Sequence, residues 1–338
     1  MYQVNKIFLK QILARQYKYK VPHVKQLKIL YPLESRKLLK VSGNDAPPFL
    51  QGLITNDMQH FEEGANSMYA MFLNNKGRVL YDTLIHKWDG NDSFFIECDK
   101  NVHTLLHKHL KLYKLKRNVD IGDVSEEFRL YALVTPTEAT VDTSIHPKKN
   151  VNIFKDPRLA DLGHRVVVTS KADHSYIENL LGEGTTIASD ETGYKYLRHR
   201  LGVSEGAGDL PPGVCFPLEA NVDYLHGVSF HKGCYIGQEL TARVHHTGVI
   251  RKRIMPLQFL DIVEEEIEKD SAITVDNEKN NNVGKFKSCV NDYGLGLVRI
   301  KEALEATALK IGNYTLKAVK PDWWPIEAPK DKATTKLQ

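Results

Sequence analysis

The sequence predicts an α+β protein with antiparallel sheets, covering helices and a small β module near its C-terminal end. The first observation is a set of three alternating or aromatic-rich runs between residues 67 and 99, separated by turn sequences. The second is residues 100–115, where apolar side chains recur at helical spacing and indicate a helix that covers the sheet. The third is the region after residue 248, where short β-type segments suggest an all-β module.

Local signals place the elements of the first half. Residues 36–41 have the pattern of a strand, and Asp45 followed by Pro47 and Pro48 is typical of a helix start, so residues 49–58 are expected to be helical. The three runs form an antiparallel meander with strands at residues 67–73, 78–88 and 93–99 and turns at residues 74–77 and 89–92.

The second half is assigned in the same way. Strands are expected at residues 128–134 and 165–169, helices at 172–181 and 192–201, and a loop at 203–213, which is rich in Gly and Pro. The terminal module is expected to contain strands at 250–259, 272–275, 283–290, 295–300 and 309–319, with a solvated connection within 261–282. Trp323 and Trp324 are expected to clamp the end of the chain onto the body.

The N-terminal residues have the composition of a mitochondrial presequence. Residues 1–33 contain seven Lys or Arg residues and no Asp or Glu, and apolar residues such as Ile7 and Phe8 recur at helical spacing. The alternatives are a basic nucleic-acid-binding arm or a disordered tail. Of the 46 basic residues, removing these seven leaves 39 against 42 acidic residues, so the remaining body is not a general polyanion binder. We therefore expect a matrix protein, cleaved before Lys37, with no nucleic-acid partner.

Composition excludes several other classes. The chain has 338 residues, of which 42% are hydrophobic and 26% charged, enough for two or three globular cores. No apolar run reaches the roughly eighteen residues that a transmembrane helix needs. Cys98, Cys215, Cys234 and Cys289 lie far apart without a Cys-x-x-Cys pair, so neither a disulfide framework nor a self-contained zinc site is indicated.

Residues 231–243 (HKGCYIGQELTAR) form the most informative segment, because they place one cysteine between two glycines in a basic context. Gly233 and Gly237 permit tight backbone turns and close approach of another molecule. Lys232 and nearby histidines would favour the thiolate of Cys234, and so would the amides of a helix that begins near residue 238. The other interpretation is that Cys234 is a small buried hydrophobic residue beside a loop.

The string KGCYIGQE at residues 232–239 resembles the signature of the YgfZ/GcvT-like family, relatives of the folate-binding T-protein of glycine cleavage. Further similar fragments occur in order at residues 49–57 (FLQGLITND), 77–82 (GRVLYD), 217–221 (PLEAN) and 294–299 (GLGLVR). The resemblance covers roughly residues 38–325. Together with the N-terminal composition, it predicts a presequence at 1–35, a GcvT-like α+β body at 36–247, a C-terminal β-barrel at 248–325 and a polar tail at 326–338.

The resemblance implies a first candidate site, a central pocket for tetrahydrofolate. The pocket candidates are Asn56, Asp57, Asp82 and Glu219, because a carboxylate can bind a pterin edge through two hydrogen bonds. The aminomethyltransferase carries paired aspartates where this chain has Tyr81 and Asp82, which argues against the transferase reaction. In the other interpretation, Asn56 and Asp57 close the preceding helix and Glu219 is a surface strand residue.

Cys234 defines a second candidate site, because the T-protein branch does not carry this cysteine signature. The resemblance to the mitochondrial iron-sulfur cluster assembly branch implies a factor, monomeric alone, that works with A-type scaffold proteins to mature [4Fe-4S] enzymes. One thiolate cannot complete the coordination of a cluster, so a [2Fe-2S] cluster would bridge Cys234 and a partner. The accompanying signature residues are Lys232, Gly233, Tyr235, Gly237, Gln238, Glu239 and Arg243.

Two other functions stay open at this point. The first is a folate-dependent one-carbon transferase or demethylase that positions its substrate with Asp82. The second is a folate-binding scaffold whose Cys234 thiol is redox-reactive without binding a metal.

Overall fold

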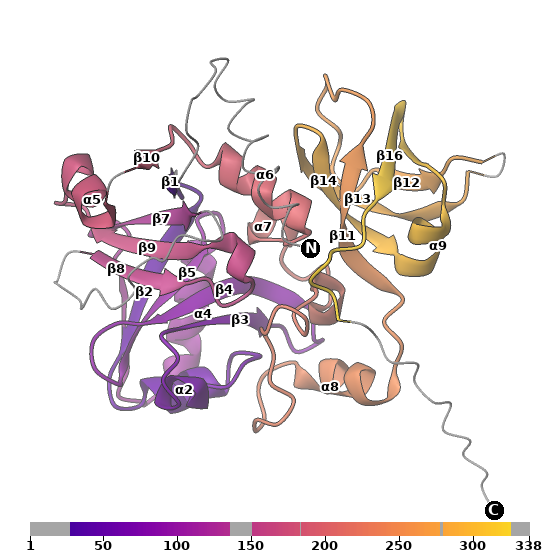
Figure 1. Ribbon diagram of the computed structural model, residues 1–338. Coiled ribbons are helices and arrows are strands. Elements are labelled where there is room, and N and C mark those ends of the chain that lie inside the picture. The colour runs from indigo at the N-terminus through magenta and orange to yellow at the C-terminus, as the bar shows by residue number, and fades with distance from the viewer. Residues whose placement is uncertain (1–27, 136–150, 183, 278–279, 326–338) are drawn as a thin grey trace, which may run out of the picture.

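The computed structural model describes residues 28–135, 151–182, 184–277 and 280–325 (Figure 1). Two five-stranded sheets and a closed six-stranded barrel make up the fold, so the α+β class and the C-terminal barrel are confirmed. None of the helices in these ranges is long and apolar enough to cross a membrane. The proposed presequence falls mostly on residues 1–27, which lie outside the described part of the chain.

The first sheet is the predicted three-stranded meander extended by two further strands at one edge. Its order is β3-β4-β5-β2-β6, and all the neighbouring strands are antiparallel. The strands are β2 (Arg36–Ser42), β3 (Ser67–Leu73), β4 (Val79–Lys87), β5 (Ser93–Asp99) and β6 (Asp120–Asp123). Helices α2 (Ala46–Gln51), α3 (Gln59–Glu62) and α4 (His103–Lys114) bury their apolar residues against one face of this sheet.

The second sheet has the order β10-β1-β7-β9-β8, with β1 and β10 running parallel. Its strands are β1 (Lys28–Pro32), β7 (Phe128–Val134), β8 (Val151–Lys155), β9 (His164–Thr169) and β10 (Thr185–Ile187). The 3-10 helix η1 (Ala160–Leu162) precedes β9, and α5 (His174–Leu181) covers the outer face. The main core lies between the two sheets, where Tyr31 and Val167 of this sheet pack with Tyr69 and Phe95 of the meander.

The barrel has the order β11-β14-β13-β12-β15-β16. Its elements are β11 (Lys252–Phe259), β12 (Ala272–Val275), β13 (Asn282–Val290), β14 (Tyr293–Arg299), α9 (Ile300–Glu305), β15 (Leu309–Ile311) and β16 (Tyr314–Ala318). Helices α6 (Thr192–Leu201) and α7 (Gly206–Asp209) connect the barrel to the sheets. Trp323 Nε1 donates to the Leu201 carbonyl at 2.7 Å and Trp324 is buried, which confirms the predicted clamp.

The structure corrects two expectations. Residues 49–58 are not one helix, because α2 ends at Gln51 and the segment that follows pairs with the sheet through the bridge between Ile54 and Phe72. The folded body also begins before Arg36. Strand β1 lies between β7 and β10, and its Leu30 is completely buried, although residues 28–32 were assigned to the presequence. The cleavage position stays a prediction, and we now expect it before Lys28.

Candidate functional site

Cys234 is the exposed thiol among the four cysteines, which the structure describes in full. It lies on a loop between the 3-10 helix η2 (Pro217–Ala220) and helix α8 (Gln238–Thr247). Burial raises the pKa of the Cys98 and Cys215 thiols to about 12, and burial also raises the pKa of Cys289. These three thiols are therefore held protonated, and Cys234 is the cysteine that a partner can reach.

The Cys234 loop lies on a platform formed by residues 51–56, directly after α2. The Thr55 hydroxyl donates to the Gly227 carbonyl at 2.6 Å, and Asn56 Nδ2 donates to the His226 carbonyl at 2.8 Å. Backbone bonds run from the Ser229 amide to the Thr55 carbonyl and from the Ile236 amide to the Gly52 carbonyl. The platform thus holds the loop on both sides of Cys234.

Lys232 fixes the centre of the loop. Its Nζ donates to the carbonyls of Gln51, Ile54 and Asn56 at 2.7, 2.9 and 2.6 Å. Burial lowers the pKa of Lys232 to about 8, and the nearby Asp57 carboxylate partly opposes this shift. The ammonium group is therefore directed into the platform, and its three carbonyl partners carry no side-chain signal that the sequence could have revealed.

The two glycines of the motif have different roles. Gly237 has a φ of +80°, and a Cβ at this position would lie 2.3 Å from the Asn74 carbonyl oxygen in the turn between β3 and β4. Gly237 therefore permits the loop to pack on this turn. At Gly233 a Cβ would meet no atom within 4 Å, so the space beside Cys234 is open to another molecule.

A hydrogen bond within the motif closes the turn after Cys234. Gln238 Oε1 accepts a hydrogen bond from the Tyr235 amide at 3.1 Å, and burial raises the pKa of Tyr235 to about 12. Helix α8 starts where the sequence predicts, but its amides form no hydrogen bond with the Cys234 thiol in the described part of the chain. Glu239 and Arg243 are exposed on α8. The His245 ring stacks on Phe230, with the ring centroids 3.5 Å apart.

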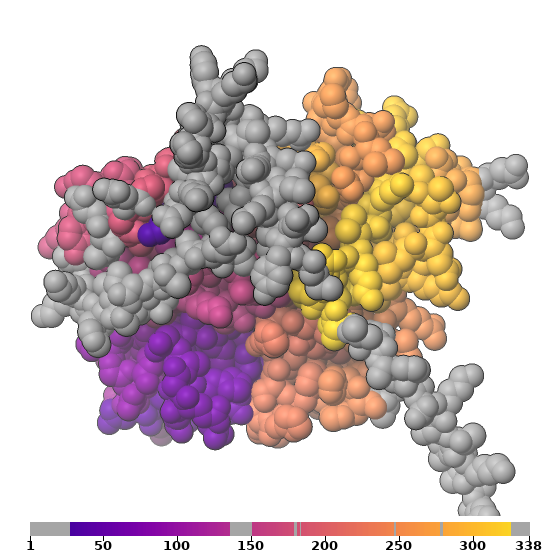
Figure 2. Space-filling model, in the orientation of Figure 1, coloured from indigo at the N-terminus to yellow at the C-terminus, as the bar shows by residue number. Residues whose placement is uncertain are grey.

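In the space-filling view, the segment around α8 forms a continuous surface with the meander below the barrel (Figure 2). In the ribbon view, α8 lies beside the meander and beneath the barrel (Figure 1). The Cys234 loop is thus supported by the N-terminal half of the body, and α8 leads from it to the barrel.

The four folate candidates make different local contacts, and their role in folate binding stays a prediction. Asn56 belongs to the platform and Asp57 follows it directly. The Asn56 side-chain oxygen accepts a hydrogen bond from the Asp57 amide at 2.9 Å, and Asp57 Oδ1 accepts one from Gln51 Nε2 at 2.9 Å. Glu219 accepts a hydrogen bond from the Phe216 amide at 3.0 Å and lies in η2, not in a strand. Asp82 lies elsewhere, in the core between the sheets.

Asp82 is part of a buried ion-pair network. Its Oδ2 lies 3.4 Å from Arg36 Nη1, and its Oδ1 accepts a hydrogen bond from the Gly206 amide at 3.0 Å. Burial raises the Asp82 pKa, and the adjacent Arg36 opposes that shift. The network continues through carboxylates and guanidinium groups that include Glu97, Asp156, Glu205, Asp209, Arg158, Arg165 and Arg198. The Asp82 side chain is thus buried, and each of its oxygens already has one partner in this network.

Two known domain families and several named proteins are similar to this chain. The model of the GCVT N-terminal domain matches residues 7–153, and that of the CAF17 C-terminal beta-barrel domain matches residues 251–326. The chain is 38% identical over 311 residues to the human "Iron-sulfur cluster assembly factor IBA57, mitochondrial", covering 87% of this chain and 85% of that protein. The chain belongs to the IBA57 family.

Other comparisons agree with this assignment. The homologue from the fungus Mycosarcoma maydis, with the same family name, is 30% identical over 352 residues and covers 87% of this chain and 84% of that protein. The crystal structure of glycine cleavage system aminomethyltransferase T from Bartonella henselae has a TM-score of 0.67 at 15% identity, covering 87% of this chain and 85% of that one. This similarity confirms the GcvT-like fold, and the IBA57 names support mitochondrial localisation.

Proposed function

We propose that this IBA57-family protein acts in the mitochondrial matrix with an A-type scaffold protein to mature [4Fe-4S] enzymes, and that Cys234 contributes a cluster ligand or reactive thiolate. The observation that carries the proposal is the exposure of Cys234 on a loop fixed by its neighbours, while the other three thiols have raised pKa values. A thiolate is both a nucleophile and a soft ligand for iron.

Cys234 needs ligands from a partner. Among the described residues, no group of three or more His, Cys, Asp or Glu side chains is placed to hold a metal ion. An iron-sulfur cluster ordinarily requires about four protein ligands. We therefore propose that the cluster is cargo, shared at the interface between Cys234 and cysteines of the scaffold.

The loop geometry supports a role for Cys234 as one cluster ligand, with the other ligands supplied by the scaffold. When Cys234 binds iron, its thiol proton can pass to solvent because the side chain is exposed. The platform limits the movement of the loop, since Lys232 holds three carbonyls on one side and the Ile236 amide binds Gly52 on the other. A preorganised ligand loses less conformational entropy on binding. The open space beside Gly233 leaves room for the partner.

The fold is of the folate-binding type, so folate binding is compatible with the fold. Asp82 already contacts Arg36 and the Gly206 amide, and Glu219 contacts the Phe216 amide. No step of the proposed function therefore uses folate.

The test is maturation of a [4Fe-4S] enzyme in cells that lack the endogenous protein. Cys234→Ser should abolish rescue of the enzyme activity at normal protein levels. Cys289→Ser is the matched control, because Cys289 is half-buried in the barrel and should retain rescue. Full rescue by Cys234→Ser would refute a ligand or nucleophile role for this thiol.

A further inference from the structure

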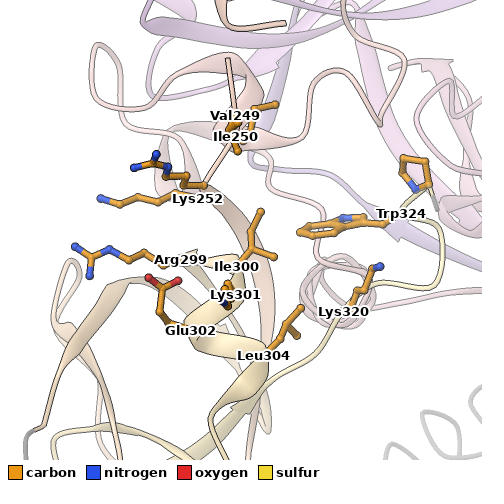
Figure 3. Close-up of a pocket in the computed structure, with 12 residues that line it drawn as sticks. Val249, Ile250, Lys252, Arg299, Ile300, Lys301, Glu302, Leu304, Lys320 and Trp324 are labelled. Atoms are coloured by element: carbon orange, nitrogen blue, oxygen red, sulfur yellow. The ribbon is translucent and has the colours of Figure 1, made fainter. Parts of the chain in front are cut away.

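A cavity of about 1010 Å³, here called the barrel groove, lies at one end of the barrel. All the residues that line it follow the Cys234 loop in the sequence. Residues 249–252, the start of α9 and the C-terminal residues Lys320, Trp324 and Pro325 line it. Figure 3 shows Ile300 and Leu304 directed toward Trp324 across the cavity, with Val249 and Ile250 at one end. The floor of this barrel groove is therefore apolar.

The rim of the barrel groove is strongly basic. It carries five cations and one carboxylate, namely Arg251, Lys252, Arg299, Lys301, Lys320 and Glu302. All five cationic residues are exposed, and none forms an ion pair with a carboxylate in the described part of the chain. Elsewhere in the barrel, Lys287 and Lys310 are paired with Asp270 and Asp276. Five unpaired cations therefore line this one groove beside a single carboxylate.

Exposed apolar residues accompany these charges. Val249 is 71% exposed and Leu304 is 39% exposed, although both are aliphatic. An apolar surface rimmed by like charges is typical of a site that binds a protein segment. A purely electrostatic nucleic-acid site would need no apolar floor.

From this combination we infer that the barrel groove binds an acidic, amphipathic segment of a partner protein. Leucine- or phenylalanine-type side chains of the segment would occupy the floor, and its carboxylates would face the rim cations. The chain's own residues 326–338 are a poor occupant by charge, since they contain three lysines and only two acidic residues.

The position of the groove relates it to the Cys234 loop. A second cavity of about 330 Å³ shares Val249, Ile250, Arg251 and Lys252 with the groove and is also lined by Leu240 and Val244 of α8. Helix α8 has ten residues and so spans about 15 Å. A partner segment in the groove would raise the effective concentration of the partner near Cys234. The inference does not require Cys234 to bind a cluster.

The test measures binding of a fluorescent peptide to the purified, iron-free protein by polarisation. The probe is a 15-residue amphipathic peptide with five glutamates on one face and leucine and phenylalanine on the other. The comparison peptide keeps the glutamates but has serine at the apolar positions. We expect the amphipathic peptide to bind about tenfold or more tightly, because only it fills the floor. Equal affinity for both peptides would overturn the inference.

Two sets of variants locate the binding. Lys301→Glu with Lys320→Glu should weaken binding at least about tenfold, and Leu304→Ser with Val249→Ser should weaken it to a similar degree. The matched control is Lys285→Glu with Lys317→Glu, which changes the charge equally at exposed barrel residues outside the groove and should retain affinity. Equal loss in the control would overturn the inference, as would retained affinity in both groove variants.

Three other occupants are distinguished in the same experiment. If a chain ending at Pro325 bound the peptide and the full-length chain did not, residues 326–338 would be the occupant of the groove and the inference would be wrong. Groove-dependent binding to vesicles containing anionic lipid, without peptide binding, would assign the groove to membranes instead. Groove-dependent dimerisation would assign it to a second copy. The variant Cys234→Ala should bind the peptide as wild type does, which separates this test from that of the proposed function.

Discussion

At the scale of single residues, Lys232 shows that a residue of the cysteine motif can hold the loop in place. From the sequence, Lys232 is expected to favour the thiolate of Cys234. In the structure its ammonium group donates to three carbonyls of the platform. A motif can therefore require a lysine for the shape of a loop as much as for charge.

The first prediction concerns this lysine. Lys232→Met keeps the aliphatic stem but leaves three carbonyls without their donor, so we expect a loss of about 1–3 kcal/mol in the free energy of unfolding. Urea denaturation measures this change, with the exposed Lys76→Met as control. A stability equal to wild type would show that the three bonds contribute nothing to holding the loop.

The second prediction separates the two glycines. Gly237→Ala should destabilise the protein by about 2–4 kcal/mol, because a left-handed φ and a contact with the Asn74 carbonyl are both unfavourable for a Cβ. Gly233→Ala should change stability by less than about 0.5 kcal/mol. Thermal unfolding of both variants measures the difference, and similar costs at the two positions would contradict this assignment.

The sequence could predict some residue roles and not others. Cys234 could be singled out because a thiol between two glycines is unusual, and its exposure agrees with that interpretation. The folate candidates depended on the family resemblance, and the structure distributes them among separate environments. The arginines that pair with Asp82 and the neighbouring carboxylates come from three distant parts of the chain, so no local pattern could have indicated them.

At the scale of elements, the strongly patterned segments were predicted best. The strands at 67–73, 93–99 and 128–134 and the helix at 192–201 have the predicted bounds. The three strands are rich in apolar and aromatic residues. Strands β1, β6, β8 and β10 were missed. They are short, and they depend on neighbours that lie far away in the sequence.

The third prediction concerns the contact between α6 and the barrel. His199 of α6 is buried, with Nε2 3.2 Å from the Ser288 hydroxyl of β13, and Ser288 donates to Asp209 at 2.6 Å. Burial lowers the pKa of His199 to about 4, although Asp209 opposes this shift and the cations of Arg198 and Lys195 support it. The unfolded chain therefore binds a proton between about pH 6.5 and 4 that the folded protein does not.

Because the folded pKa is the lower one, this histidine makes the protein less stable as pH falls through that window. Between pH 7 and 5 the His199 contribution should be about 2 kcal/mol. Urea denaturation of wild type and His199→Gln at both pH values measures this contribution. The effect of the carboxylates is the same in both proteins and cancels in the difference between them. An identical pH dependence in both proteins would rule out this titration.

At the scale of the whole molecule, the position of β1 limits where a presequence can end. Ile29, Leu30 and Tyr31 are buried, and β1 pairs with strands on both sides. Losing this strand would remove both the apolar burial and one strand of the second sheet. The processed protein should therefore retain Lys28.

The fourth prediction follows directly. A chain that starts at Lys28 should fold, whereas one that starts at Arg36 should lose on the order of 5 kcal/mol, comparable to the total stability of many domains. Thermal unfolding and soluble yield compare the two chains, and mass spectrometry of the mitochondrial protein locates the natural N-terminus. Equal stability of the two chains, or a natural N-terminus beyond Pro32, would contradict this prediction.

The central claim is that Cys234 contributes a ligand or reactive thiolate to a cluster shared with an A-type scaffold protein. The most direct measurement mixes the protein with a [2Fe-2S]-loaded A-type scaffold under anaerobic conditions and follows complex size together with visible absorption. We predict a cluster-bearing heterocomplex for wild type and for Cys289→Ala, and its loss for Cys234→Ala. A cluster-bearing complex with the same size and spectrum in Cys234→Ala, or no complex with wild type, would contradict the claim.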